Sequence, residues 1–421
     1  MFDSFLQKAK IALFDPVIRK RILYTLGGLF LFRLLAAVPA PGIGQANLAP
    51  FFADNQFLGL LNIFSGGGLS SISIVMLGVG PYITASITMQ LMTVMSPRLK
   101  SLYHDEGQAG KRKFTQWSRL LTVPLGAVQA FGFLTLLQQQ GVIANFDWFS
   151  FLINVVVITA GAMLLMWIGE LITEFGVGNG ISLLIFAGIV AQLPTAIDQM
   201  ILTYTPSQLP LYLGFLAISA VIVWGIVMVT EAVRPLPITH SRQRSQGGGG
   251  SVSSYLPLKV NQAGVMPIIF GLSIMLFPQM IINFLGVAPN ATGFAGFIQN
   301  IYESDILYAA VYFALVFLFT FFYTAITFEP ESVAENLQKS GSFIPGVRPG
   351  ESTRQHIARV MSRITFSGAV FLGLIAILPI LMQQITGVQT LAIGGTALLI
   401  VVAVLVDLIK RLDGQIAMRQ Y

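Results

Sequence analysis

Long apolar segments recur along this chain, and they constrain its fold more than any other feature. Several of them exceed the roughly 18–20 residues that a helix needs to cross a bilayer. Charged residues make up only 10% of the 421 residues, whereas a soluble globular chain has about 25%. So few charged groups cannot cover a water-exposed surface. The sequence therefore predicts an all-α polytopic membrane protein, and it lacks the short alternating segments of a membrane β-barrel.

The apolar runs predict ten membrane-spanning helices, which divide into two sets of five. An odd number of spans in each set inverts the second set relative to the first, as in inverted-repeat membrane proteins. The first set covers residues 22–201 and the second covers residues 202–409. The individual spans are placed at residues 22–40, 75–95, 119–137, 151–172, 180–201, 210–232, 264–285, 306–328, 364–384 and 390–409.

The basic residues indicate the orientation, because lysine and arginine in short loops stay on the cytoplasmic side. All of them except Arg33 lie in residues 1–21, at the connections that follow even-numbered spans, or in the tail 410–421. Both termini and the loops 231–262 and 329–363 are therefore expected in the cytoplasm. Residues 1–21 are predicted to be an amphipathic helix on the membrane surface, since their basic cluster leads into a long apolar run rather than a cleavage site.

Titratable side chains are nearly absent from the predicted spans, which argues against a transporter driven by protons or sodium. Glu170 and Asp407 fall at the cytoplasmic ends of spans, whereas Arg33 lies about 18 Å of helix beyond Arg21. We interpret it as a structural residue bound to backbone carbonyls or to a helix end. The three histidines lie in loops without metal-ligand spacing and there is no cysteine, so no metal site or cofactor is predicted. No nucleophile–base pair is evident, so no enzymatic activity is predicted.

The stretch NIFSGGGLSSISI, residues 62–74, is rich in glycine and serine although apolar segments flank it. It lacks the lysine of a phosphate-binding loop. The residues alone leave two interpretations open. The stretch is either an ordinary surface turn or an irregular segment inside a membrane cavity, where neighbouring groups form hydrogen bonds with its backbone N–H and C=O groups. The isoleucine and valine residues of the spans would make a path that holds water poorly and acts as a hydrophobic constriction.

Several long motifs resemble those of the SecY family, the central subunit of the protein-conducting channel of the general secretory pathway. They include FSGGGLSSISIVMLGVGPYITASITMQLM, GELITEFGVGNGISLLIFAGI, LPLKVNQAGVMPIIF, FFYTAITFEPESVAENLQKSGSFIPGVRPGEST and GGTALLIVV. The resemblance extends from the first predicted span to the last. It implies an hourglass of ten helices in two pseudo-symmetric halves, in the cytoplasmic membrane of a bacterium.

The resemblance assigns roles to particular residues, each of which also has an ordinary structural interpretation. An aliphatic ring at the waist of the channel, otherwise core or lipid-facing packing, matches Val79, Ile83, Ile181, Ile185, Ile269 and Ile400. A plug, described as a short helix within residues 57–74 and otherwise a loop, includes Asn62, Phe64, Ser65, Gly66, Gly67, Gly68, Leu69, Ser70 and Ile72. The resemblance also implies a lateral gate, where the second and third spans face the seventh and eighth. Its residues are Gln90, Thr122, Asn261 and Ser273. Ordinary hydrogen bonding between helices is the alternative for these four residues.

The cytoplasmic loops are the expected docking site for a ribosome or a SecA motor ATPase. Arg348 in GVRPGEST matches a docking arginine of the family, and Arg242 and Arg244 lie in the other docking loop. Ordinary positive-inside charge is the alternative for all three. The glycine run Gly247–Gly250 resembles a flexible linker, so an engineered or trimmed origin of that loop stays open.

The function implied by the resemblance is that of a passive protein-conducting channel. It would move unfolded secretory chains across the membrane, recognise signal sequences, and release apolar segments sideways into the membrane lipids. SecE-like and SecG-like small membrane subunits are the implied partners, together with the SecA motor and the ribosome. On physical grounds alone, an inverted-repeat secondary transporter for a small solute is the alternative, and an intramembrane enzyme is a weaker one.

Overall fold

The structure is a computed structural model that describes residues 14–42, 62, 65–69, 71–104, 106–139, 141, 147–202, 209–240, 254–284, 294–386 and 389–420. Most of the expected amphipathic segment 1–21 lies outside the described residues. Residues 16–21 begin the first described long helix. Asp15 caps this helix by accepting a hydrogen bond from Val17 N at 2.8 Å, and Pro16 occupies its first position, where no backbone donor is needed.

Helices make up most of the first part of the chain and end where the sequence becomes polar or glycine-rich. They are α2 (Pro16–Ala36), α5 (Gly80–Met95), α6 (Pro97–His104), α7 (Gly107–Gln139), α8 (Trp148–Phe175), α9 (Gly180–Val190) and α10 (Leu193–Leu202). The predicted span 180–201 is therefore two helices, which meet at residues 191–192.

The second part of the chain is also mainly helical. Its helices are α11 (Leu209–Glu231), α12 (Met266–Phe284), α13 (Phe294–Glu303), α14 (Asp305–Thr327), α15 (Pro330–Lys339), α16 (Glu351–Thr386) and α17 (Gln389–Gln420). The helix α17 continues through the residues that were expected to form a separate tail, 410–421, as far as Gln420.

Each of the ten predicted spans overlaps helix, but length and composition identify fewer membrane-crossing helices. Within the described residues, four helical stretches are long and apolar enough to cross a membrane: Gly107–Gln138, Trp148–Phe175, Asp305–Lys339 and Glu351–Leu378. Shorter apolar helices cover Gly180–Thr195, Leu216–Glu231 and Met266–Met275. The count of ten spans and the inverted halves remain predictions.

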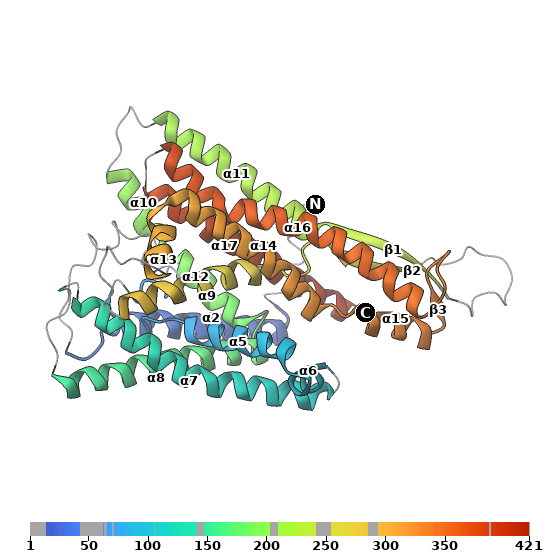
Figure 1. The fold of residues 1–421 in the computed structure, drawn as a ribbon, viewed down its shortest axis with the longest axis horizontal. Helices are drawn as coiled ribbons and strands as arrows, with labels where there is room; N and C mark the ends of the chain where they lie inside the picture. Colours follow the sequence, from blue (N-terminus) through green and yellow to red (C-terminus); the bar gives the residue numbers. More distant parts are fainter. Residues whose placement is uncertain are drawn as a thin grey trace.

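The helices form two groups that follow the order of the chain (Figure 1). In the first group α7 contacts α5 and α8, and α2 contacts α8; in the second, α16 contacts α14 and α17, and α11 contacts α17. Two connections join the groups. The helix α12 contacts α5 and α7, and α17 contacts α9. Residues near these two connections therefore lie at the centre of the molecule.

A small β-sheet departs from the all-α class. The strand β1 (Val233–His240) pairs antiparallel with β2 (Ser254–Lys259) and, at its far end, with β3 (Ser342–Phe343). Pro235 lies opposite Pro257, a pair that cannot exchange backbone hydrogen bonds, because proline has no N–H group. Leu236 and Leu258 of the sheet are buried in one cluster with Ile357 of α16. The two loops expected in the cytoplasm are therefore one packed unit.

Candidate functional site

A central hydrophobic cluster contains the six residues assigned to the aliphatic ring. Val79, Ile83, Ile185, Ile269 and Ile400 are all buried in it, and Ile181 packs against it with partial burial. They come from the start of α5 and from α9, α12 and α17, the elements that join the two helix groups. The structure therefore brings together six residues that lie as far as 321 positions apart in the chain.

Close packing of α8 and α9 sets the position of the ring residues on α9. Asn179 caps this helix, accepting hydrogen bonds from Ile181 N at 3.1 Å and Ser182 N at 3.4 Å. A Cβ added to Gly180 would lie 1.9 Å from the carbonyl oxygen of Gly169. Only glycine allows this approach, and it holds the first turn of α9 against α8.

Two cavities with polar walls reach the ring residues. The larger, about 450 Å³, is lined by Ile83, Ile181, Ile185 and Ile269 together with Tyr82, Gln90, Arg119, Glu170 and Asn179. The other, about 230 Å³, is lined by Ile185, Ile269 and Ile400 together with Lys259, Asn261, Asp407, Lys410 and Arg411. Both cavities thus combine an aliphatic surface with charged and amide groups.

Ion pairs satisfy much of the charge in these walls. Arg119 Nε of α7 lies 2.7 Å from Glu170 Oε1 of α8, and Arg411 Nε lies 2.8 Å from Asp407 Oδ2 within α17. Exposed pairs of this kind add little to stability. Their effect here is to keep the cavity walls hydrophilic beside the aliphatic ring.

In the glycine-rich stretch 62–74, Asn62 is helical, residues 65–69 and 71–74 form turns, and Ser73 makes an isolated bridge to Pro39. The short helix expected within residues 57–74 falls partly on residues outside the described ones and stays a prediction. Of the residues assigned to the plug, Asn62, Ser65, Gly66, Gly67, Gly68, Leu69 and Ile72 are described, whereas Phe64 and Ser70 lie outside the described residues. Gly66 and Gly67 have φ angles of +68° and +82°, a region that favours glycine. Positive φ at neighbouring positions interrupts a helix, which explains the turns.

The apolar side chains of this loop divide between two clusters, and Ile74 packs against the central cluster that contains the ring. Leu69 and Ile72 are buried in a second cluster with Leu134 of α7 and Ile158 of α8. The loop thus makes substantial contacts of its own with the first helix group.

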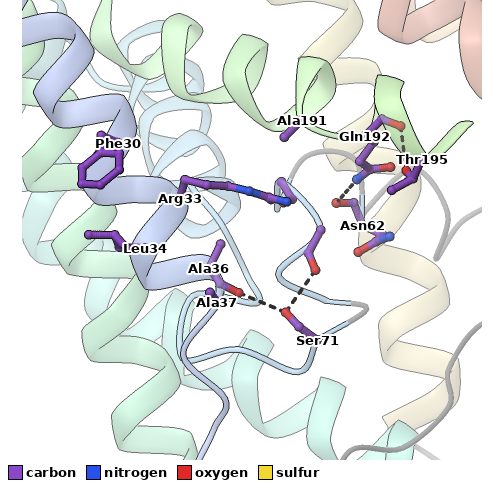
Figure 2. A pocket seen from close by; sticks show the side chains of 12 residues that line it. Phe30, Arg33, Leu34, Ala36, Ala37, Asn62, Ser71, Ala191, Gln192 and Thr195 are labelled. Carbon is purple, nitrogen blue, oxygen red and sulfur yellow. Dashed lines mark hydrogen bonds between the residues drawn. The ribbon is translucent and has the colours of Figure 1, made fainter. Parts of the chain in front are cut away.

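Two polar side chains reach the loop, one from the helix α2 and one from the turn after α9 (Figure 2). Arg33 Nη1 donates to the carbonyl oxygen of Gly66 at 2.7 Å, and Gln192 Nε2 donates to the carbonyl oxygen of Asn62 at 2.9 Å. The first contact agrees with the interpretation of Arg33 as a residue bound to backbone carbonyls. Sequence reasoning does not single out Gln192, because one glutamine at the end of an apolar run has no distinguishing pattern.

The four residues assigned to the lateral gate make hydrogen bonds only within their own segments, among the bonds that the structure describes. Thr122 Oγ1 donates to Ser118 O and Ser273 Oγ donates to Ile269 O, both at 2.8 Å, while Asn261 Nδ2 donates to Gly264 O at 3.2 Å. Gln90 Nε2 contacts Ser86 Oγ at 3.4 Å. Within the described part of the chain, buried Gln90 Oε1 and Asn261 Oδ1 have no hydrogen-bond partner.

The loops expected to dock partners meet at the small sheet. Thr239 pairs with Phe343 and His240 pairs with Ser342, so the end of β1 lies beside the loop that carries Arg348. The Arg348 side chain is exposed, and its carbonyl oxygen accepts a hydrogen bond from Thr353 Oγ1 at 2.8 Å. Arg242 and Arg244 lie outside the described residues.

An exposed network at the start of α16 follows the Arg348 loop. Arg354 Nε donates to Glu351 Oε2 at 2.7 Å and Gln355 Nε2 donates to Glu351 Oε1 at 3.0 Å. These hydrogen bonds, the one from Arg354 foremost, lower the pKa of Glu351 to about 2. Glu351 is therefore negatively charged at the helix N-terminus, where an acidic residue is favourable.

Comparisons with known proteins place this arrangement in a family. A family model described as SecY matches residues 73–409. The protein translocase subunit SecY of Mycobacterium tuberculosis is 40% identical over 429 residues, covering 96% of each chain. The subunit of the same name from Synechocystis is 40% identical over 432 residues, covering 100% of this chain and 96% of the relative.

Solved structures share the fold at low sequence identity. A SecY structure, described as one in which the plug domain stabilises the closed state of the translocation channel, matches with a TM-score of 0.68 and 18% identity. Sec61 in the canine ribosome-channel complex matches with a TM-score of 0.62 and 16% identity. Each match covers 94% of this chain and 92% of the other.

Proposed function

This chain belongs to the SecY family, and from that premise we propose how its described residues perform the work of a protein-conducting channel. As a protein translocase subunit it is a channel component, not an enzyme and not a transporter of small solutes. The curated relatives match along nearly their whole length, so the function applies to the whole chain.

The proposed architecture is ten spans in two inverted halves, 22–201 and 202–409, with both termini in the cytoplasm of a bacterium. The two helix groups, joined through α12 and α9–α17, support the division into halves. The basic residues support the orientation, because all except Arg33 fall on one predicted side. The bacterial relatives support the proposed bacterial origin.

The closed pore is proposed to be sealed by the ring of Val79, Ile83, Ile181, Ile185, Ile269 and Ile400. The single observation that carries this proposal is that these side chains share one cluster, and that all of them except Val79 line cavities whose walls also carry charged and amide groups. A constriction of aliphatic side chains excludes water and hydrated ions. Because the residues come from both halves, separation of the halves would widen the ring for an unfolded chain.

The loop 62–74 is proposed to act as the plug, and the contact of α12 with α5 and α7 is proposed to act as the lateral gate. A gate whose polar residues, among the described residues, bond only within their own segments is held mainly by apolar packing. An apolar signal segment can replace such packing at little cost, since it offers the same kind of surface. Gln90 Oε1 and Asn261 Oδ1, which have no hydrogen-bond partner in the described part of the chain, add a preference for opening.

Small SecE-like and SecG-like subunits, a SecA motor and the ribosome are the proposed partners, with signal sequences and secretory chains as cargo. The Sec61 relative in a ribosome-channel complex supports the ribosome as a partner. The sheet that joins the loops at β1 and β3 supports a shared docking surface with Arg348, and Arg242 and Arg244 follow β1 directly. Basic loop tips attract the polyanionic ribosomal RNA.

Reconstitution tests this function. Vesicles that contain the chain with its co-purifying small subunits are expected to import a fluorescent unfolded secretory chain only when SecA and ATP are supplied. The matched control is the same vesicle with ATP alone. Transport of a small solute down an ion gradient, without motor or ribosome and without import of the secretory chain, would contradict the proposal.

A further inference from the structure

We propose that Arg33 and Gln192 are positioning residues that fasten the loop 62–74 in its closed place. This inference rests on the proposed role of that loop as a plug. The two side chains come from different elements, the helix α2 and the turn after α9, and extend toward the loop from two sides of a cavity (Figure 2). That cavity measures about 460 Å³.

The Arg33 contact is the stronger of the two. Its donor is a charged guanidinium, and hydrogen bonds with one charged partner are shorter and stronger than neutral ones. The Nη1–O distance of 2.7 Å to Gly66 agrees with this. Among the described residues Arg33 forms no ion pair. Its charge, which is unfavourable at membrane depth, is therefore offset by the dipole of this loop carbonyl.

The backbone of the loop is in direct contact with the helices that hold it. A Cβ on Gly66 would lie 2.5 Å from Phe32 Cζ of α2 and 3.2 Å from Gly188 Cα of α9. Gly188 is three residues beyond Ile185, about 4.5 Å along the helix. The fastened loop thus lies about one turn from the ring, and a small displacement separates Gly66 from both helices.

The fastening contacts come from the first half of the chain. Besides Arg33 and Gln192, Ser71 Oγ donates to Ala36 O at 3.0 Å and Ala40 N donates to Ile72 O at 2.8 Å. The loop's buried side chains pack on α7 and α8. Separation of the halves therefore does not by itself break these contacts. Opening requires a second step, in which Arg33 and Gln192 release the loop carbonyls.

The test compares ion conductance of the closed channel, reconstituted with its small subunits in planar bilayers. Arg33→Met keeps the unbranched stem of the side chain and removes the guanidinium donors. Loss of one charge-assisted hydrogen bond shifts the ratio of docked to undocked loop by roughly 10- to 100-fold, and conductance is expected to rise accordingly. Arg33→Lys retains a charged donor, so its closed-channel conductance should be lower than that of Arg33→Met. Gln192→Leu removes only a neutral donor, so its conductance should also be lower than that of Arg33→Met.

Two controls separate the outcomes. Thr195→Val alters the same cavity wall, but Thr195 bonds to the carbonyl of Gln192 rather than to the loop, so it should remain sealed. Deletion of residues 65–72 tests the plug itself. If the deletion variant conducts ions and Arg33→Met does not, the proposed positioning role of Arg33 is wrong, while the plug role of the loop is supported. If the deletion variant does not conduct ions, the plug role itself is wrong. Leakage of Arg33→Met that Arg33→Lys does not reduce, with a lowered Tm in both, overturns the positioning role.

Discussion

Replacing Gly66 with alanine perturbs the proposed plug by adding a single methyl group. The residue has a φ of +68°, which costs an L residue roughly 1–2 kcal/mol. The new Cβ would lie 2.5 Å from Phe32 Cζ, and overpacking of this kind costs typically about 1–3 kcal/mol. The docked loop is therefore destabilised by about 2–5 kcal/mol, which shifts its equilibrium by roughly 30-fold to a few thousand-fold.

Closed-channel conductance in planar bilayers is the assay, with Tm measured on the same preparation. Gly66→Ala is expected to leak strongly while the helices retain their Tm, because the cost falls on the loop. The matched control is Gly27→Ala in α2, where an added Cβ meets no atom within 4 Å. A folded Gly66→Ala protein that stays as tightly sealed as wild type would refute the close packing of this loop.

The remaining predictions concern the ring, the docking loop and one titrating group. Ile185→Ala, at a side chain that is 1% exposed, should lower stability by about 2–5 kcal/mol and raise the leak; unchanged conductance would remove Ile185 from the seal. Arg348→Glu should weaken ribosome binding and flatten its salt dependence in a sedimentation assay; an identical salt slope would count against docking there. The lowered pKa of Glu351, about 2 in the folded chain, contributes stability above the unfolded pKa. That contribution is lost as pH falls through about 2. The Tm difference between wild type and Glu351→Gln should therefore shrink toward pH 2, and a constant difference would contradict it.

Apolar length predicts where most helices lie because a membrane helix must satisfy its backbone internally. The span expected at 306–328 is the helix α14 (Asp305–Thr327), nearly residue for residue. The span expected at 180–201 is broken at residues 191–192, where α10 starts with Leu193 and Pro194. Proline in the first turn of a helix marks such a start, so this break was readable from the sequence.

The strands and the site were harder to predict, for different physical reasons. Pro235 and Pro237 argue against a strand when taken alone, yet β1 forms because Pro235 lies opposite Pro257 and neither needs to donate. The ring unites residues from four elements and has no local pattern, so only the family resemblance points to it. The bond from Arg33 to Gly66 joins groups 33 positions apart, which no periodicity reveals.

The most direct test of the channel uses the absence of cysteine from the chain. Single cysteines at Ile83, Ile185 and Ile269 would be cross-linked to a secretory chain stalled midway through the membrane, with exposed Leu213 and Val221 of α11 as controls. We expect adducts at the three ring positions and none at the controls. Adducts at Leu213 and Val221, with none at the ring, would show that the translocating chain takes another path.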